Sequence, residues 1–221
     1  ASPGPINFNT LDLTNPYDQS ETGHLAMAGT YKVSLSKFED GKITELVPAQ
    51  PFVIKSLNAA SLPATDMKAL NTFCKKVSEL RRATAAADAY LKELTNKINF
   101  IKSAIIDVQL PQSNVAEQVH KVERRLMAAN IKMNGDASLS KREFEIPPSI
   151  NGRIGTIEYT LWTSTSAPTQ TAINSFEIAA KQFDILLPEL KSIDQEIKIV
   201  ETTLEKNGAP YTPGRFPEWR K

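Results

Sequence analysis

The sequence predicts an α+β protein that is mainly α: an antiparallel four-helix bundle with long helices, preceded by a small N-terminal β-sandwich-like sheet. Two observations carry this prediction. Apolar and polar residues alternate in Tyr31–Ser36, shortly before Asp40-Gly41, which is the pattern of a strand that enters a tight hairpin turn. Further along, apolar residues recur with 3-4 spacing over about six heptads, which indicates a long packed helix. We therefore divide the chain into a β segment, 1–60, and a helical domain, 61–221.

The β segment begins with an extended lead-in, residues 1–28, rich in Pro, Asn, Thr and Gly, with at most one edge strand at Ile6–Leu13. After the Asp40-Gly41 turn, return strands are expected within Lys42–Val47 and Gln50–Leu57. Pro48 separates them or marks a bulge, because proline cannot donate a hydrogen bond to the ladder. Three or four strands do not close a sandwich, so we expect this sheet to pack against something else.

The longest helix is expected over residues 65–108, with Thr65 as its N-cap. Its middle, Ala83–Ala87, is made of small residues, which allow close approach of a neighbouring helix. One heptad position of the seam holds Leu70, Val77, Thr84, Leu91, Ile98 and Ile105, and the other holds Phe73, Leu80, Ala87, Leu94, Ile101 and Val108.

A second helix is expected from Ser113 or Asn114 to the stop signal Asn134-Gly135, followed by a loop over residues 135–148. The apolar stripe of this helix comprises Val115, Val119, Val122, Leu126 and Met133. Residues 149–163 are read as a short third helix. Two glycines and the alternation in Ile157–Leu161 also fit a strand, so both readings stay open.

The fourth helix is expected over residues 168–207, with Ser166 as its N-cap and Asn207-Gly208 at its end. Its apolar residues begin Ile173, Phe176, Ala180, Phe183, Leu187 and Leu190, and continue with Ile193, Ile197, Val200 and Leu204. The step from Leu190 to Ile193 breaks the 3-4 alternation just after Pro188. We interpret this break as a kink or register slip within one helix.

Composition excludes several classes of function. Lys+Arg total 26 and Asp+Glu 25, so a net charge of +1 gives no electrostatic case for nucleic acid or an anionic membrane. No apolar run approaches the roughly 18 residues of a transmembrane helix. The single cysteine, Cys74, permits no internal disulfide and reads as a small buried residue. The first residues lack an initiator Met and a signal peptide, and read as the middle of a longer polypeptide.

The sequence shows no catalytic constellation. The two histidines, His24 and His120, have no partner at metal-ligand spacing, so we expect neither a metal site nor a cofactor. Nucleotide-binding glycine motifs and the nucleophile elbow of hydrolases are absent from the sequence. Arg81-Arg82 and Arg124-Arg125 could clamp phosphate, but neighbouring acids favour solvated helix faces with ion pairs.

Glu143 and Glu145 form an acidic pair that could in principle serve a glycosidase. Their position on a loop without an aromatic platform makes this the weaker reading. The C-terminal tail is the most specific feature, because Pro210–Trp219 contains three prolines and three aromatic residues. It could contact a peptide or a sugar, or fold back onto the bundle or sheet. The candidate ligand-binding residues are Trp162, Tyr211, Arg215 and Trp219.

Four motifs resemble the C-terminal region of bacterial BNR-repeat, sortilin-like β-propeller proteins, which are often labelled glycosyl hydrolases. The motifs are Ala28–Leu35 with Asp40-Gly41, then Pro147–Ile150, Trp162–Thr169 and Gly208–Arg215, in that order. Ala28 stands where proline is usual before Gly-Thr-Tyr, and the return strand around Leu46–Pro51 is longer than in the family pattern. The resemblance covers the chain from about residue 23, and no Asp-box of the propeller repeats occurs in it.

This resemblance implies a non-catalytic C-terminal structural or interaction module of a larger exported bacterial protein, in the periplasm, secreted or on the cell surface. Its implied partner is the upstream β-propeller domain of the same polypeptide; a homodimer and a protein or glycan partner are further expectations. The alternatives are an accessory part of a glycoside hydrolase and a carbohydrate- or peptide-binding module. We expect no enzyme activity from this chain, while the parent protein could be a glycosyl hydrolase.

Overall fold

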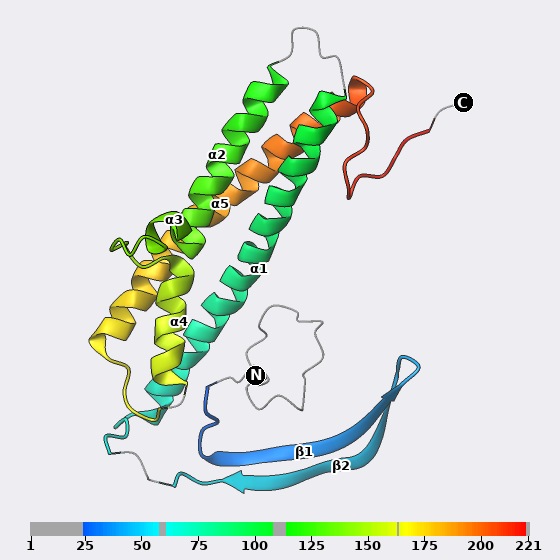
Figure 1. Cartoon of the computed structure of the whole chain (residues 1–221). Coiled ribbons are helices and arrows are strands. Elements are labelled where there is room, and N and C mark those ends of the chain that lie inside the picture. The colour runs from blue at the N-terminus through cyan, green and yellow to red at the C-terminus, as the bar shows by residue number, and fades with distance from the viewer. Residues whose placement is uncertain (1–23, 58–60, 108–113, 163, 220–221) are drawn as a thin grey trace.

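The computed structural model describes residues 24–57, 61–107, 114–162 and 164–219. Within these ranges a two-stranded antiparallel sheet precedes five helices, which confirms the mainly α, α+β class. The elements are β1 (Gly29–Glu39), β2 (Lys42–Ile54), α1 (Met67–Ile106), α2 (Val115–Asn134), α3 (Ala137–Ser140), α4 (Ile150–Leu161) and α5 (Gln170–Lys206). Figure 1 shows an elongated helical bundle, with the β hairpin extending from its base.

Of the predicted seam, Val108 lies outside the described residues, and Phe73, Leu80 and Ile105 are only partly buried. Helix α1 buries the other eight positions, as predicted. It begins two residues later than expected, because Asp66 and not Thr65 is the N-cap. The Asp66 carboxylate accepts hydrogen bonds of 2.9 Å from the N–H groups of Lys68 and Ala69, two of the donors that a helix start leaves unsatisfied. The buried residues of α1 are Leu70, Cys74, Val77, Thr84, Ala87, Leu91, Leu94, Ile98, Ile101 and Ala104.

The predicted four-helix cross-section is not confirmed. Helices α2 and α4 follow one another along α1 and α5 (Figure 1), and each of them contacts both long helices. The bundle is therefore built from α1, α5 and α2 at one end and from α1, α5 and α4 at the other, and all four helices contribute to the core where α2 meets α4. One core cluster contains the buried residues of α2, the C-terminal half of α1, α5 from Ala179 onward, and Ile150 and Ile154 of α4. The second cluster joins Ile157 and Leu161 of α4 to the beginning of α1 and to Ala172 of α5. One long apolar seam is thus covered by two short helices in succession.

Residues 149–163 are helical over Ile150–Leu161, which decides between the two open readings. Ser149 is the N-cap, and its hydroxyl accepts a 3.1 Å hydrogen bond from the N–H of Gly152. Ile150, Ile154, Ile157 and Leu161 are all buried on one face, and this burial outweighs the low helix propensity of the glycines. The expected loop over residues 135–148 also contains the short helix α3, which the sequence reading missed.

Helix α5 runs through Pro188 without ending, as predicted, but it has no register slip. Phe183, Leu186, Leu190, Ile193, Ile197, Val200 and Leu204 are buried in unbroken 3-4 alternation. Leu187, placed on the stripe from the sequence, is 38% exposed, whereas its neighbour Leu186 is fully buried. Proline has no N–H to bond the carbonyl of Asp184, four residues earlier, and both Asp184 and Pro188 lie on the exposed face of the helix. The N-cap is Thr169 and not Ser166.

The hairpin confirms the predicted turn and corrects the predicted strands. Asp40 and Gly41 have φ values of 52° and 75°, as a two-residue turn of this hand requires. Beyond the turn, one strand replaces the two expected return strands, because β2 continues through Pro48. Irregular register between Val33 and Ser36 accommodates the proline.

The predicted sandwich-like sheet is wrong for the residues described, where the sheet has just two strands. Every residue of β1 and all of β2 except Ile54 are exposed, so no described part of the chain covers either face of the hairpin. The edge strand expected at Ile6–Leu13 lies outside the described residues. Among the helices that are described, none has the length and apolarity to cross a membrane.

Candidate interaction site

Strands β1 and β2 expose an unusually apolar surface. It consists of nine large side chains, which we call the hairpin surface: Tyr31, Val33, Leu35, Phe38, Ile43, Leu46, Val47, Phe52 and Val53. Their exposed fractions range from 36% for Tyr31 to 74% for Phe38. The nine side chains are distributed over both faces of the hairpin, because successive residues of a strand point to opposite faces. Single exposed apolar residues are ordinary, but so many on one hairpin indicate an interaction site.

Few contacts within the chain support the hairpin. The rings of Tyr31 and Phe52 pack across the strands with centroids 6.0 Å apart, and the Tyr31 hydroxyl donates a 2.8 Å hydrogen bond to the carbonyl of Met27. Lys37 and Glu39 form an exposed ion pair near the turn. An isolated two-stranded sheet is marginally stable in water. The hairpin surface therefore has the properties of an interface that lacks its partner.

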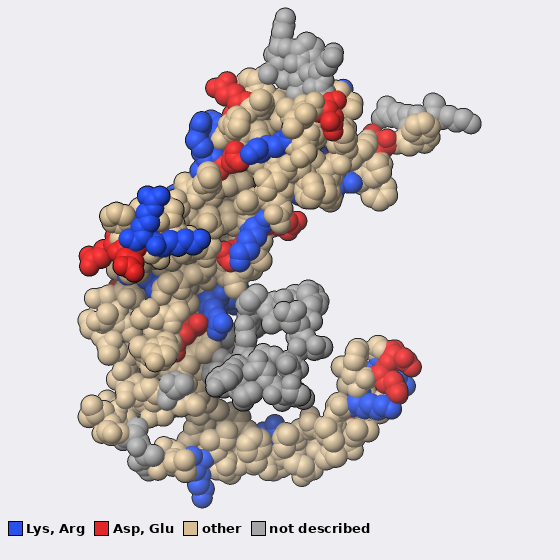
Figure 2. Space-filling view, viewed as in Figure 1, with Lys and Arg blue, Asp and Glu red and all other residues tan. Residues whose placement is uncertain are grey.

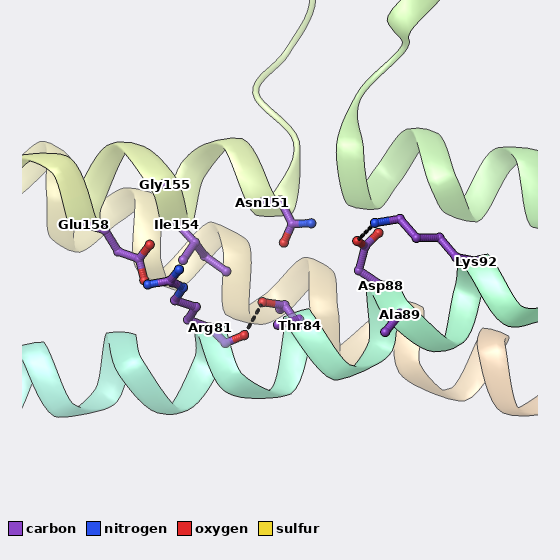
Figure 3. A pocket seen from close by; sticks show the side chains of 10 residues that line it. Arg81, Thr84, Asp88, Ala89, Lys92, Asn151, Ile154, Gly155 and Glu158 are labelled. Carbon is purple, nitrogen blue, oxygen red and sulfur yellow. Dashed lines mark hydrogen bonds and ion pairs between the residues drawn. The ribbon is translucent and has the colours of Figure 1, made fainter. Parts of the chain in front are cut away.

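A groove of about 320 Å³ lies between α1 and α4, where side chains are small (Figure 3). Its walls include Ala85 and Ala89 of α1, from the predicted small-residue stretch and the turn after it, and Gly155 of α4. The charged groups along it pair with one another. Arg81 Nε lies 3.3 Å from Glu158 Oε1, and Lys92 Nζ lies 2.7 Å from Asp88 Oδ2. The groove is thus open and polar, with its charges largely internally compensated.

The arginine pairs of the sequence join helices to one another. The Arg81 guanidinium lies 4.9 Å from the ring centroid of Trp162, a cation–π contact that adds to its ion pair with Glu158 of α4. Arg125 of α2 pairs with Glu196 of α5. Both arginines are ion-paired, but the predicted pairing within a solvated helix face is wrong for them, because the partners lie on neighbouring helices and both side chains are partly buried.

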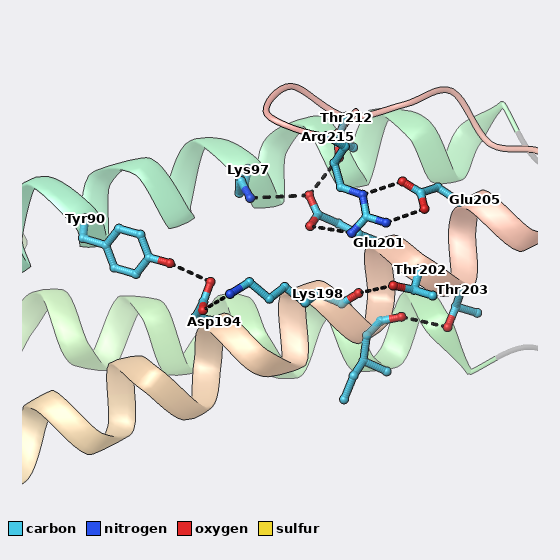
Figure 4. A network of polar contacts seen from close by, with 11 residues as sticks. Tyr90, Lys97, Asp194, Lys198, Glu201, Thr202, Thr203, Glu205, Thr212 and Arg215 are labelled. Carbon is cyan, nitrogen blue, oxygen red and sulfur yellow. Dashed lines mark hydrogen bonds and ion pairs between the residues drawn. The ribbon is translucent and has the colours of Figure 1, made fainter. Parts of the chain in front are cut away.

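The C-terminal tail is fastened to α5 by a cluster of charged side chains, which we call the tail cluster (Figure 4). At its centre Glu201 is buried, with only 1% of its side chain exposed. The Thr212 hydroxyl donates a 2.8 Å hydrogen bond to Glu201, and Lys97 Nζ lies 3.8 Å from the same carboxylate. Arg215 binds Glu205 through two nitrogens and lies 3.5 Å from Glu201. The tail therefore folds back onto the bundle, but it does not pack its aromatic residues there as the sequence suggested, because Tyr211, Phe216 and Trp219 are exposed.

Tyr90 and Asp194 form a second polar contact between α1 and α5, beside the tail cluster (Figure 4). The Tyr90 hydroxyl donates a 2.6 Å hydrogen bond to Asp194 Oδ1, and Lys198 pairs with the other carboxylate oxygen. Burial and the bond to Asp194 raise the pKa of Tyr90 to about 12. Burial acts to raise the pKa of Asp194, but hydrogen bonds from Lys198 and Tyr90 outweigh it and lower that pKa.

We expect one of the five tyrosines to ionise near pH 12 in a spectrophotometric titration at 295 nm, and Tyr90→Phe to remove that component. Because the folded pKa exceeds the unfolded value of about 10, this tyrosine contributes stability below pH 10 that is lost as the pH rises towards 12. Asp194→Asn should shift the component to lower pH. An unchanged titration curve for Tyr90→Phe would contradict the assignment.

The structure separates the four predicted ligand-binding residues. Trp162 is buried under Arg81, with 9% exposure, and presents no open ring face. Arg215 is engaged in the tail cluster. Tyr211 is 44% exposed, and its hydroxyl is hydrogen-bonded to the backbone of Glu218. Trp219 is 87% exposed. The four residues therefore do not form one site, and only the tail residues Tyr211 and Trp219 offer exposed rings.

The remaining candidates for chemistry lie apart. Glu143 and Glu145 are both exposed on the loop after α3. His24 Nδ1 is 3.5 Å from the Ser78 hydroxyl, and burial lowers its pKa. His120 pairs with Glu123 on its own helix at 3.4 Å. Throughout the described ranges, no group of three His, Cys, Asp or Glu side chains is placed to hold a metal ion.

Sequence reasoning missed two features, Glu201 and the openness of the hairpin. Glu201 lies four residues after Ile197 and so falls on the apolar stripe of α5, where a charged residue signals a buried pair. The sequence contains no signal for the exposure of the hairpin, because alternation of apolar and polar residues predicts a buried strand face but does not indicate which segment covers it. Comparison with family models, curated proteins and solved structures found no match to this chain.

Proposed function

We propose that this chain is a non-catalytic structural and interaction module that docks, through the hairpin surface, onto a β-rich part of the same larger polypeptide. The observation that carries the proposal is the exposure of nine large apolar side chains on a hairpin that has no covering layer among the described residues. The resemblance to the C-terminal region of sortilin-like β-propeller proteins supports the partner, a preceding β domain. It also supports an exported location, in the periplasm, outside the cell or on its surface.

The difference between the packed helices and the exposed hairpin supports the same function. Helices α1, α2, α4 and α5 bury their apolar stripes against one another and make a rigid scaffold about 60 Å long, at 1.5 Å for each of the 40 residues of α1. The hairpin contributes almost nothing to that core. The helices thus bury their own apolar residues without the hairpin, whose side chains stay exposed. This arrangement is expected of a module that presents its hairpin to a partner. The proposal assigns the chain no catalytic step.

The test uses Val33→Lys and Val53→Lys, with Ile199→Lys as the matched control. The three residues are exposed to similar degrees, at 57%, 61% and 62%, but Ile199 lies on α5. In residues 1–221 alone, all three changes should leave the melting temperature nearly unchanged. In the longer gene product, a lysine in a buried hairpin interface should cost about 2 kcal/mol or more, and the control nothing.

Thermal unfolding and limited proteolysis of both proteins measure the difference. If the hairpin variants are as silent as Ile199→Lys in the longer gene product, the hairpin surface is not an interface and the proposal fails. A gene product without a preceding β domain would contradict the partner that we propose.

A further inference from the structure

The two outer edges of the hairpin differ. A two-stranded sheet leaves one row of backbone N–H and C=O groups open on each strand, and such rows are templates for another strand. β2 contains Pro48 and Pro51, which lack N–H groups and interrupt its hydrogen-bonding capacity. β1 contains no proline over its 11 residues. Only β1 therefore carries a full set of backbone donors.

The strand register indicates which donors of β1 are free. Lys32 lies opposite Pro51, and a proline cannot exchange N–H···O bonds with its partner. Lys32 and Pro51 therefore form a non-hydrogen-bonded pair, in which the backbone N–H and C=O groups point to the outer edges of the hairpin. Because the two kinds of pair alternate, the N–H groups of Thr30 and Lys32 point to the outer edge, while Tyr31 and Val33 bond to β2.

Charge along the hairpin identifies the chemistry of the partner. Charged residues gather around the turn, and Figure 2 shows them as blue and red atoms at the far end of the projecting arm. They are Lys37, Glu39, Asp40, Lys42 and Glu45. Between the turn and the bundle the strands carry a single charge, Lys32, and the surface is otherwise tan. The surface of the partner that contacts the strands must therefore be apolar, and the charged turn remains exposed to water.

We propose that β1 accepts an additional strand from a neighbouring β-sheet of the same polypeptide, so that the hairpin becomes the edge of a larger, apolar-faced sheet. Backbone hydrogen bonds to Thr30 and Lys32 set the register, and the apolar side chains of the hairpin surface give specificity. This inference deepens the proposed function and rests on it. To the proposed function it adds two points: β1 provides the pairing edge, and the partner is a β-sheet.

The exposed area supports an interface of this kind. At the observed exposures, the hairpin surface presents on the order of 1,000 Å² of apolar residue area, counted over both faces of the sheet. A stable interface buries about 800 Å² on each partner. Strand pairing alone covers an edge and leaves both faces exposed to water. To bury this area, the partner must therefore also supply further layers that pack on the faces of the enlarged sheet.

The experiment compares Lys32→Pro with Lys32→Ala in the longer gene product. Both changes remove the lysine side chain, but only proline removes the outward N–H. Hydrogen exchange at Thr30, resolved by mass spectrometry, should be roughly 100-fold slower in the longer gene product than in residues 1–221. Lys32→Pro should abolish most of that protection, and Lys32→Ala should preserve it. A retained proton NOE between the Tyr31 and Phe52 rings would show that the proline variant keeps its hairpin.

Other outcomes overturn the inference in distinguishable ways. If Val33→Lys and Val53→Lys destabilise the longer protein but Thr30 exchanges freely, the hairpin docks by its faces and strand addition is wrong. If those lysine variants are silent, the proposed function itself fails. If residues 1–221 form a dimer in light scattering and Lys32→Pro makes it a monomer, the partner is a second copy of this chain, which overturns the partner named here.

Discussion

Replacing Ile197 with alanine should lower the free energy of unfolding by about 3 kcal/mol, within the range of 2–5 kcal/mol for deleting a large aliphatic side chain from a packed core. Ile197 is fully buried in the larger core cluster, where α5 meets α1 and α2. The loss combines the transfer free energy of the removed methyl groups with the cavity that remains, because packed helices relax incompletely.

The matched control is Ile199→Ala, two residues along the same helix. Ile199 is 62% exposed, so its truncation should change stability by no more than about 0.5 kcal/mol. Urea unfolding followed by circular dichroism at 222 nm measures both variants. Equal midpoints for the two would show that this face of α5 is not the one buried, and would contradict the three-helix packing.

Replacing Arg215 with alanine should destabilise the protein by about 2 kcal/mol and release the tail. Truncating one member of a buried ion pair leaves the other charge without compensation, at a cost of roughly 3–5 kcal/mol. Glu201 retains the Thr212 hydroxyl and Lys97 as partners, so the expected cost falls below that range. Residues 209–219 should then become sensitive to protease, because Arg215 joins them to both Glu201 and Glu205.

Lys132→Ala supplies the comparison for an exposed pair. Lys132 lies 2.7 Å from Glu189, but half of its side chain is exposed, and pairs of this kind contribute about 0–1 kcal/mol. Denaturation midpoints and the rate of tail cleavage should therefore respond to Arg215→Ala and not to Lys132→Ala. A tail that stays resistant to protease in Arg215→Ala would show that the apolar contacts of Ala209 hold it instead.

Local signals in the sequence predicted the hairpin turn and most helix ends. Asp40-Gly41 has few alternatives, because both residues must adopt positive φ, and Asn134-Gly135 ends α2 for a similar reason, with Gly135 at a φ of 89°. N-caps were less certain. Thr65 and Ser166 are as suitable in isolation as Asp66 and Thr169, and the true start depends on where tertiary packing begins to favour the helix.

The interaction site could be predicted only in part. The alternating residues of Tyr31–Ser36 indicated a buried strand face, whereas the described part of the chain leaves both faces open. Trp162 was predicted from the sequence as a ligand contact, yet Arg81, which is distant in sequence, covers its ring. The type of a residue indicates what its side chain can bind, but whether that side chain is exposed depends on elements that are distant in the sequence.

The sequence by itself determined which residues of each helix are apolar and where the chain turns. Periodicity is a local property, so the stripe of α1 could be read residue by residue. The tertiary structure alone decided which stripes meet. The 20 residues of α2 and the 12 of α4 together approach the 40 of α1, so two short helices share one long seam and the bundle is three helices across at each end. The tertiary structure also decided that Glu201 is buried within the tail cluster and that the hairpin surface is exposed. Both depend on contacts between segments that are far apart in the sequence, which local spacing cannot predict.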